Sequence, residues 1–212
     1  MKQLFKVTIF IFSFFIYVFA QGFEVKATGN QTFSFKDKNG RNQATFHSTT
    51  PFEDIDGLTT SITGNVSLDV KNFAGTLKGE FTIPVASLKT GMEKMEKDLR
   101  SSSWLNADKY PVIVFKITKV ANVRSLQPNK LSAEVTGDFT LHGVTKEVTT
   151  QDTVTYLDES EETRARMPGD LLGVIASFDI HLSDFNVEHL LLGKRVSNDI
   201  TIRVNLVGSN KL

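Results

Sequence analysis

The stretch Asp199-Ile-Thr-Ile-Arg-Val-Asn-Leu-Val207, close to the end of the 212-residue chain, decides the fold. Apolar and polar residues alternate along it, and the apolar set is Ile200, Ile202, Val204 and Leu206. Successive side chains of a β-strand point to opposite faces of the sheet. The alternation therefore predicts a strand with one buried face and one polar face.

The same period of two recurs in several earlier stretches of the chain. Their apolar sets are Phe33 and Phe35; Val66, Leu68 and Val70; Phe81, Ile83 and Val85; Ile113, Phe115 and Ile117; Val135, Phe139 and Leu141; and Ala176, Phe178, Ile180 and Leu182. Strands at such short spacing, separated by Gly or Asn turns, are typical of an antiparallel all-β sandwich or barrel. Which face of each strand points inward is left open by the sequence.

Local signals predict where these strands start and stop. Asn39-Gly40 predicts a hairpin turn, since type I′ geometry needs a positive φ at both central residues. Pro84 has no N–H to donate, so its strand should end there or lie at a sheet edge. Residues 158–170 are polar and rich in turn formers, which predicts a long exposed loop. Three glycines are expected to mark strand entries: Gly64, Gly79 and Gly137.

One short α-helix is predicted after residue 90. Thr90 and Glu93 have the spacing of a capping box, with Thr90 as the N-cap. Met92, Met95 and Leu99 recur at i, i+3 and i+7 and define one apolar face. The remaining positions mix both signs of charge, which is typical of a solvated helix face.

The first 20 residues have the features of a secretory signal peptide. A short basic region with Lys2 and Lys6 precedes an apolar run, and Ala20 is a small residue before a cleavage site at Gln21. A membrane anchor is the alternative, but the apolar run is shorter than the ~20 residues that span a bilayer. We therefore expect residues 1–20 to be removed, and residues 21–212 to form one domain in the periplasm or outside the cell.

Composition excludes several classes of function. The chain has no Cys, so thiol catalysis and thiolate metal sites are impossible. Without the two lysines of the signal segment, 22 basic and 24 acidic residues remain. Such a balance lacks the basic footprint of a nucleic-acid-binding protein and the polybasic patch that attracts anionic lipid.

The sequence carries no motif of a known catalytic centre or metal site. It has no GxSxG, no P-loop, no GxGxxG and no HExxH, and its four histidines do not pair at a metal-ligand spacing. His181 should point outward from its strand, and His142 beside Gly143 suits a turn. Acid–base work by the acidic residues around Glu53 is the alternative to a plain polar loop there.

The apolar β faces leave two arrangements open. A barrel of about eight strands can close around a cavity that holds one small ligand, with the Met-containing helix as a lid. The alternative is an ordinary core that is filled by the protein's own side chains and has no ligand cavity.

Three stretches together resemble the YceI-like family. The first covers residues 81–115, from Phe81-Thr-Ile-Pro-Val-Ala-Ser-Leu-Lys-Thr-Gly91 to Tyr110-Pro-Val-Ile-Val-Phe115; the second is Gly137-Asp-Phe-Thr-Leu-His-Gly-Val-Thr-Lys146; the third is Phe178-Asp-Ile-His-Leu-Ser-Asp-Phe185 with residues 196–207. They follow one another in the family's order. Two departures stand out: Leu182 and Asn186 stand where the family usually has Arg and Gly, and residues 44–55 lack the family's usual N-terminal strand pattern. We expect the rim near Leu182 to lack a cationic contact for a head group.

The resemblance implies an exported, extended, antiparallel lipocalin-like β-barrel that binds a polyisoprenoid, for example an isoprenoid quinone, in its interior. It brings no catalytic residue and no resident cofactor, and a homodimer stays open. A stress or interaction protein with a filled core and a lipid-modifying enzyme using His142 or His181 are the rivals. The residues expected to contact the lipid are Phe81, Ile83, Met92, Met95, Leu99, Phe115, Ile117, Phe139, Leu141, Phe178, Ile180, Leu182 and Ile202.

Overall fold

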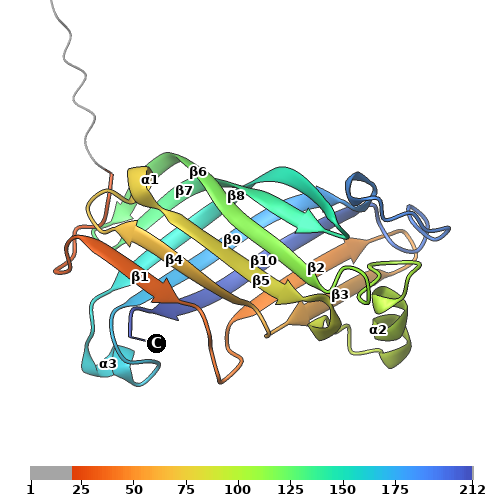
Figure 1. Cartoon of the computed structure of the whole chain (residues 1–212), viewed down its shortest axis with the longest axis horizontal. Helices are drawn as coiled ribbons and strands as arrows, with labels where there is room; N and C mark the ends of the chain where they lie inside the picture. Colours follow the sequence, from red (N-terminus) through yellow and green to blue (C-terminus); the bar gives the residue numbers. More distant parts are fainter. Residues whose placement is uncertain (1–20, 212) are drawn as a thin grey trace, which may run out of the picture.

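The computed structural model describes residues 21–211, which form one antiparallel sheet rolled into a barrel (Figure 1). The predicted signal segment lies outside the described residues. The strands are β1 (Asn30–Ser34), β2 (Gln43–Thr49), β3 (Asp54–Thr59), β4 (Thr63–Asp69), β5 (Lys78–Pro84), β6 (Val112–Gln127), β7 (Lys130–Leu141), β8 (Val144–Leu157), β9 (Leu171–His181) and β10 (Asp199–Ser209). The α-helices are α1 (Phe73–Thr76), α2 (Glu93–Arg100) and α3 (Glu161–Arg164), and two 3-10 turns are η1 (Val85–Ser87) and η2 (Leu182–Phe185).

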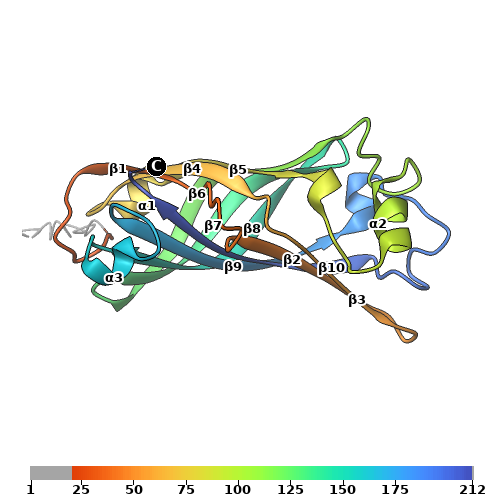
Figure 2. The same cartoon turned by 90° about the horizontal axis from the view of Figure 1, so that it is seen from below.

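Eight of these strands close the barrel. The sheet runs β1-β4-β5-β6-β7-β8-β9-β10, and β1 pairs again with β10 at Ser34 and Ser209. The β2–β3 hairpin is added to β10 through residues 43–47 and projects beyond the barrel on the side of α2 (Figure 2). The prediction of an eight-stranded antiparallel barrel is confirmed.

The hairpin predicted at Asn39-Gly40 is wrong. Gly40 does turn the chain with φ +62°, but β1 pairs with β4 and β10, whereas β2 pairs with β10 and β3. Barrel closure therefore overrides this local turn signal. A two-residue turn with positive φ at both positions lies instead at His142-Gly143, between β7 and β8. His142 accordingly has the turn role expected of it, and Pro84 ends β5 as predicted.

The observed helices differ from the sequence-based prediction in three ways. There are three short α-helices in the described residues rather than one, and α3 lies inside the stretch predicted as loop, where Ser160 and Thr163 form its capping box. The capping box predicted at Thr90 and Glu93 is absent. Gly91 has φ +77°, so α2 begins two residues later than expected and Met92 is its N-cap.

The barrel is filled at the end that carries α1 and α3. Phe23, Phe33 and Phe73 are fully buried there with Tyr156, and their rings pack at centroid distances of 5.6–5.7 Å. Tyr156 donates a 2.7 Å hydrogen bond to Asp170, which satisfies its buried hydroxyl. This plug leaves space for a ligand only towards the opposite end.

Candidate functional site

The barrel encloses an apolar cavity of about 510 Å³ whose lining extends from Phe73 of α1 to Met95 and Leu99 of α2. Exposed residues among its lining, including Glu53, Met92 and Leu191, mark the opening at that end. The volume lies in the range of small-molecule pockets, roughly 300–1,000 Å³. The filled-core arrangement thus describes one end of the barrel and the ligand-cavity arrangement the other.

All thirteen residues predicted to contact a lipid line this cavity. Nine of them lie in strands and share the inner face, and α2 with its N-cap contributes Met92, Met95 and Leu99 at the opening. Leu182 belongs to η2 rather than to a strand, yet its buried side chain still faces the cavity. That these residues bind a lipid stays a prediction.

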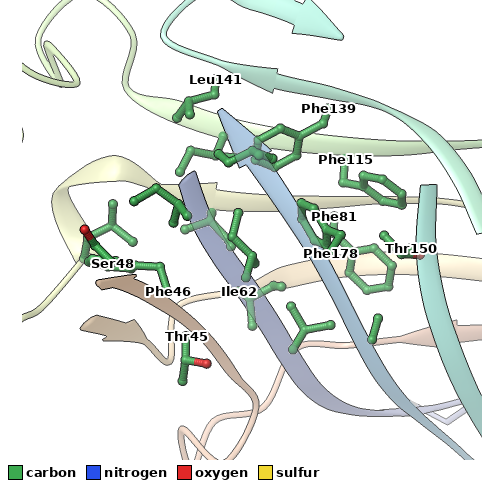
Figure 3. A pocket seen from close by; sticks show the side chains of 18 of the residues that line it. Thr45, Phe46, Ser48, Ile62, Phe81, Phe115, Phe139, Leu141, Thr150 and Phe178 are labelled. Atoms are coloured by element: carbon green, nitrogen blue, oxygen red, sulfur yellow. The ribbon is translucent and has the colours of Figure 1, made fainter. Parts of the chain in front are cut away.

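Aromatic rings from neighbouring strands form the wall of the cavity (Figure 3). Phe178 stacks on Phe115 at 6.3 Å between ring centroids and meets Phe139 edge-on at 5.5 Å. Phe139 in turn meets Phe185 edge-on at 5.6 Å. These contacts hold the rings in defined orientations, so the apolar surface is preformed rather than assembled around a ligand.

Glycines in the adjacent strands make room for these rings. A Cβ added to Gly137 would lie 2.6 Å from the Phe115 ring, and one added to Gly64 would lie 2.5 Å from the Phe81 ring. Gly137 lies in the middle of β7, so the prediction that it marks a strand entry is wrong. Its function in the fold is to let the Phe115 ring lie against the backbone.

The buried side chain of Glu96 holds α2 at the opening of the cavity. Glu96 accepts hydrogen bonds from Lys89 Nζ at 2.9 Å and from Thr90 N at 3.2 Å. The Lys89 hydrogen bond holds the pKa of Glu96 below its ordinary value. Because Met95 and Leu99 lie on the same short helix, this ion pair fixes the position of the apolar face that covers the cavity.

Two cationic side chains border the cavity on elements other than that of Leu182, and the absence of a cationic contact near Leu182 itself stays a prediction. Lys94 of α2 and Arg195 of the loop before β10 both border the cavity. Asn186 has φ +55°, a left-handed conformation that glycine adopts without strain, which is why Asn is acceptable where the family has Gly.

One polar pair inside the cavity was missed by sequence reasoning. Thr150 and Asp152 of β8 line the cavity, and Thr150 Oγ1 lies 2.5 Å from Asp152 Oδ1. Burial raises the pKa of Asp152 to about 7 from an ordinary 3.8, although the Thr150 hydrogen bond opposes that shift. The available signal was the alternation Val148, Thr150, Asp152, Val154, which places an acid on an inner face.

None of the four histidines lines the cavity itself, although His189 stacks on the lining residue Trp104 at 4.2 Å between ring centroids. His181 points outward, and its Nδ1 lies 2.5 Å from Asp199 Oδ1; His47 makes a similar contact with Asp56 at 2.7 Å. Across residues 21–211, no three side chains of the metal-ligating types gather at one point. In the same residues, no helix has both the length and the apolar character to cross a bilayer.

Comparison with known proteins identifies the fold and the family. A family model described as YceI-like domain matches residues 26–208. A UPF0312 protein of Vibrio parahaemolyticus is 31% identical over 133 residues, which is 63% of this chain and 65% of that relative. The chain thus spans slightly less than two thirds of the length of this curated relative.

Two solved structures share the barrel. BcnA of Burkholderia cenocepacia superposes with a TM-score of 0.64 at 21% identity, covering 81% of this chain and 99% of BcnA. A polyisoprenoid-binding domain from Saccharophagus degradans, implicated in plant cell wall breakdown, gives a TM-score of 0.60 at 14% identity, covering 87% and 99%. At these identities the likeness establishes the fold alone.

Proposed function

The chain belongs to the YceI-like domain family, and from that premise we propose that it is an exported binding protein without catalysis. It holds a polyisoprenoid or a similar long apolar lipid, such as an isoprenoid quinone, in the barrel. The observation that carries the proposal is the preformed aromatic and aliphatic cavity of about 510 Å³. The polyisoprenoid-binding domain of Saccharophagus degradans, which shares the fold, supports this class of ligand.

The size of the cavity fits part of such a chain. A protein cavity of about 150 Å³ holds benzene, so about 510 Å³ holds roughly 20 carbon atoms, or about four isoprene units. At ~0.8 kcal/mol per buried methylene, the transfer supplies about 16 kcal/mol. After an association cost of ~4–15 kcal/mol, about 1–12 kcal/mol remains, a range that includes micromolar affinity at about 8 kcal/mol. A longer tail would emerge at the α2 end.

A charge placed on the cavity wall tests the proposal. Phe178→Asp puts a carboxylate among the aromatic rings, whereas Ile175→Asp puts the same charge on the outer face of β9, where Ile175 is 58% exposed. We expect Phe178→Asp to lose at least ~90% of lipid recovered by solvent extraction, because an unpaired charge in an apolar site is costly. Ile175→Asp should recover as much lipid as the wild type.

Circular dichroism of both variants separates loss of binding from loss of fold. Equal lipid recovery from a folded Phe178→Asp protein would contradict the assignment of this face to the ligand. Export is a further part of the proposal and rests on the signal features of residues 1–20.

A further inference from the structure

The carboxyl group of Asp152 has no structural role that explains its position. The ionisable residues that line the cavity are Glu53, Lys94, Asp98, Asp152 and Arg195. Four of them belong to the turn, helix and loop at the opening, whereas Asp152 lies within a barrel strand. Among the described residues it forms no ion pair, and its side chain makes one hydrogen bond, with Thr150. A buried carboxyl group without a cation costs stability.

The hydrogen bonds of Thr150 show which carboxyl oxygen of Asp152 is available to a ligand. Thr150 Oγ1 lies 2.5 Å from Asp152 Oδ1 and 3.1 Å from the carbonyl oxygen of Val135. A threonine hydroxyl has one proton, so it cannot fully satisfy both acceptors. Thr150 Oγ1 donates to Asp152 Oδ1, and the Val135 carbonyl oxygen is the second acceptor within reach of the same hydroxyl, so neither contact uses Asp152 Oδ2. Asp152 Oδ2 is left as an acceptor in this arrangement, as it is in the ionised carboxylate.

The neighbouring strands leave space around that oxygen. Asp152 is in register with Ala133 of β7 and Ala176 of β9, and Ala176 lines the cavity beside it. Small side chains on both sides keep the carboxyl group open to the cavity. The residues deeper in the barrel, Val154 and Leu172 among them, are apolar and offer no competing polar partner.

From this geometry we propose that the ligand carries a hydrogen-bond donor, a hydroxyl group, at the end that lies deepest, and that Asp152 Oδ2 accepts its hydrogen bond. The inference rests on the proposed lipid-binding function and narrows it to long-chain alcohols of the isoprenoid class. An acceptor-only group, such as an ether or a quinone carbonyl, has no proton to donate to this oxygen, and it finds a donor here only when the carboxyl group is itself protonated. Asp152 is thus a specificity-determining residue.

Three lipids that differ at one end test the proposal. An isoprenoid alcohol of about 20 carbon atoms, its methyl ether and the parent hydrocarbon each displace a fluorescent fatty-acid probe from the protein. A hydrogen bond to a carboxyl group is worth about tenfold in affinity. The wild type should bind the alcohol about tenfold more tightly than the ether, and Asp152→Leu should bind both equally. Glu147→Leu, which removes an exposed acid from the same strand, should keep the preference.

Each outcome has a separate meaning. Equal affinity of the wild type for alcohol and ether, or a preference that survives in Asp152→Leu, overturns the role of Asp152 and leaves the lipid carrier intact. Failure of all three lipids to displace the probe overturns the proposed function as well. The comparison on the wild type needs no variant, so a misfolded Asp152→Leu protein would not protect the proposal.

Discussion

Asp152→Asn should make the barrel more stable at alkaline pH, and the size of the effect follows from the cavity. Burial raises the pKa of Asp152 to about 7, against 3.8 for an unperturbed Asp. Between these two values the folded protein keeps a proton that the unfolded chain has lost. Stability therefore falls as pH rises from about 4 to about 7, and the penalty is complete above that range.

The magnitude is the pKa difference multiplied by ~1.36 kcal/mol, which gives about 4 kcal/mol lost between about pH 4 and about pH 8. The Asp152→Asn variant would have no such dependence at this position, and its amide oxygen can still accept the Thr150 hydrogen bond. Several other carboxyl groups have lowered pKa values and act in the opposite direction, so only the difference between wild type and variant isolates Asp152.

The assay is urea unfolding of both proteins at half-unit steps from about pH 4 to about pH 8, followed by fluorescence of Trp104. The difference in the free energy of unfolding should grow with pH in favour of Asp152→Asn and level off above about pH 7. A difference that is flat across this range, or that grows in favour of the wild type, would refute the argument that the carboxyl group is buried in an apolar cavity.

Three further predictions concern the wall, the lid and the export of the protein. Gly137→Ala should destabilise the barrel by roughly 1–3 kcal/mol in urea unfolding, because the new Cβ meets the Phe115 ring; an unchanged midpoint would argue against that contact. Glu96→Gln should release lipid several-fold faster in a chase experiment, and wild-type release should speed up as pH falls and the carboxylate held by Lys89 is protonated. Identical release rates would show that α2 is not a lid. The intact mass of the exported protein should equal that of a chain that begins at Gln21. A mass that includes residues 1–20 would contradict the prediction of a cleaved signal peptide.

The period of two predicted the strands and the side chains that share a face, whereas the barrel was implied by the resemblance to the YceI-like family and the inward face was left open. Alternation along β5, β6 and β10 fixes which side chains share a face, and closure of the barrel turns one of the two faces towards the interior. The side chains Phe81, Phe115 and Ile202 line the cavity for that reason. The pattern grouped these side chains on common faces, and the closed barrel showed that those faces point inward.

Features that depend on distant contacts were not predictable in this way. Asn39-Gly40 has the composition of a hairpin turn, but β1 gains more by closing the barrel against β4 and β10. The start of α2 is set by the left-handed Gly91 and by Glu96, which reaches back to Thr90, and neither follows from residue spacing. Asp152 was missed because an acid in a strand is usually solvated.

Native and denaturing mass spectrometry of the mature protein, purified from the compartment to which it is exported, tests the central claim most directly. We expect a stoichiometric apolar adduct that is present in the native spectrum and released on denaturation. This adduct should have an isoprenoid skeleton and a hydroxyl group. A clean apo mass that persists after incubation with isoprenoid alcohols and quinones would contradict it, and would place the function of the barrel on its surface.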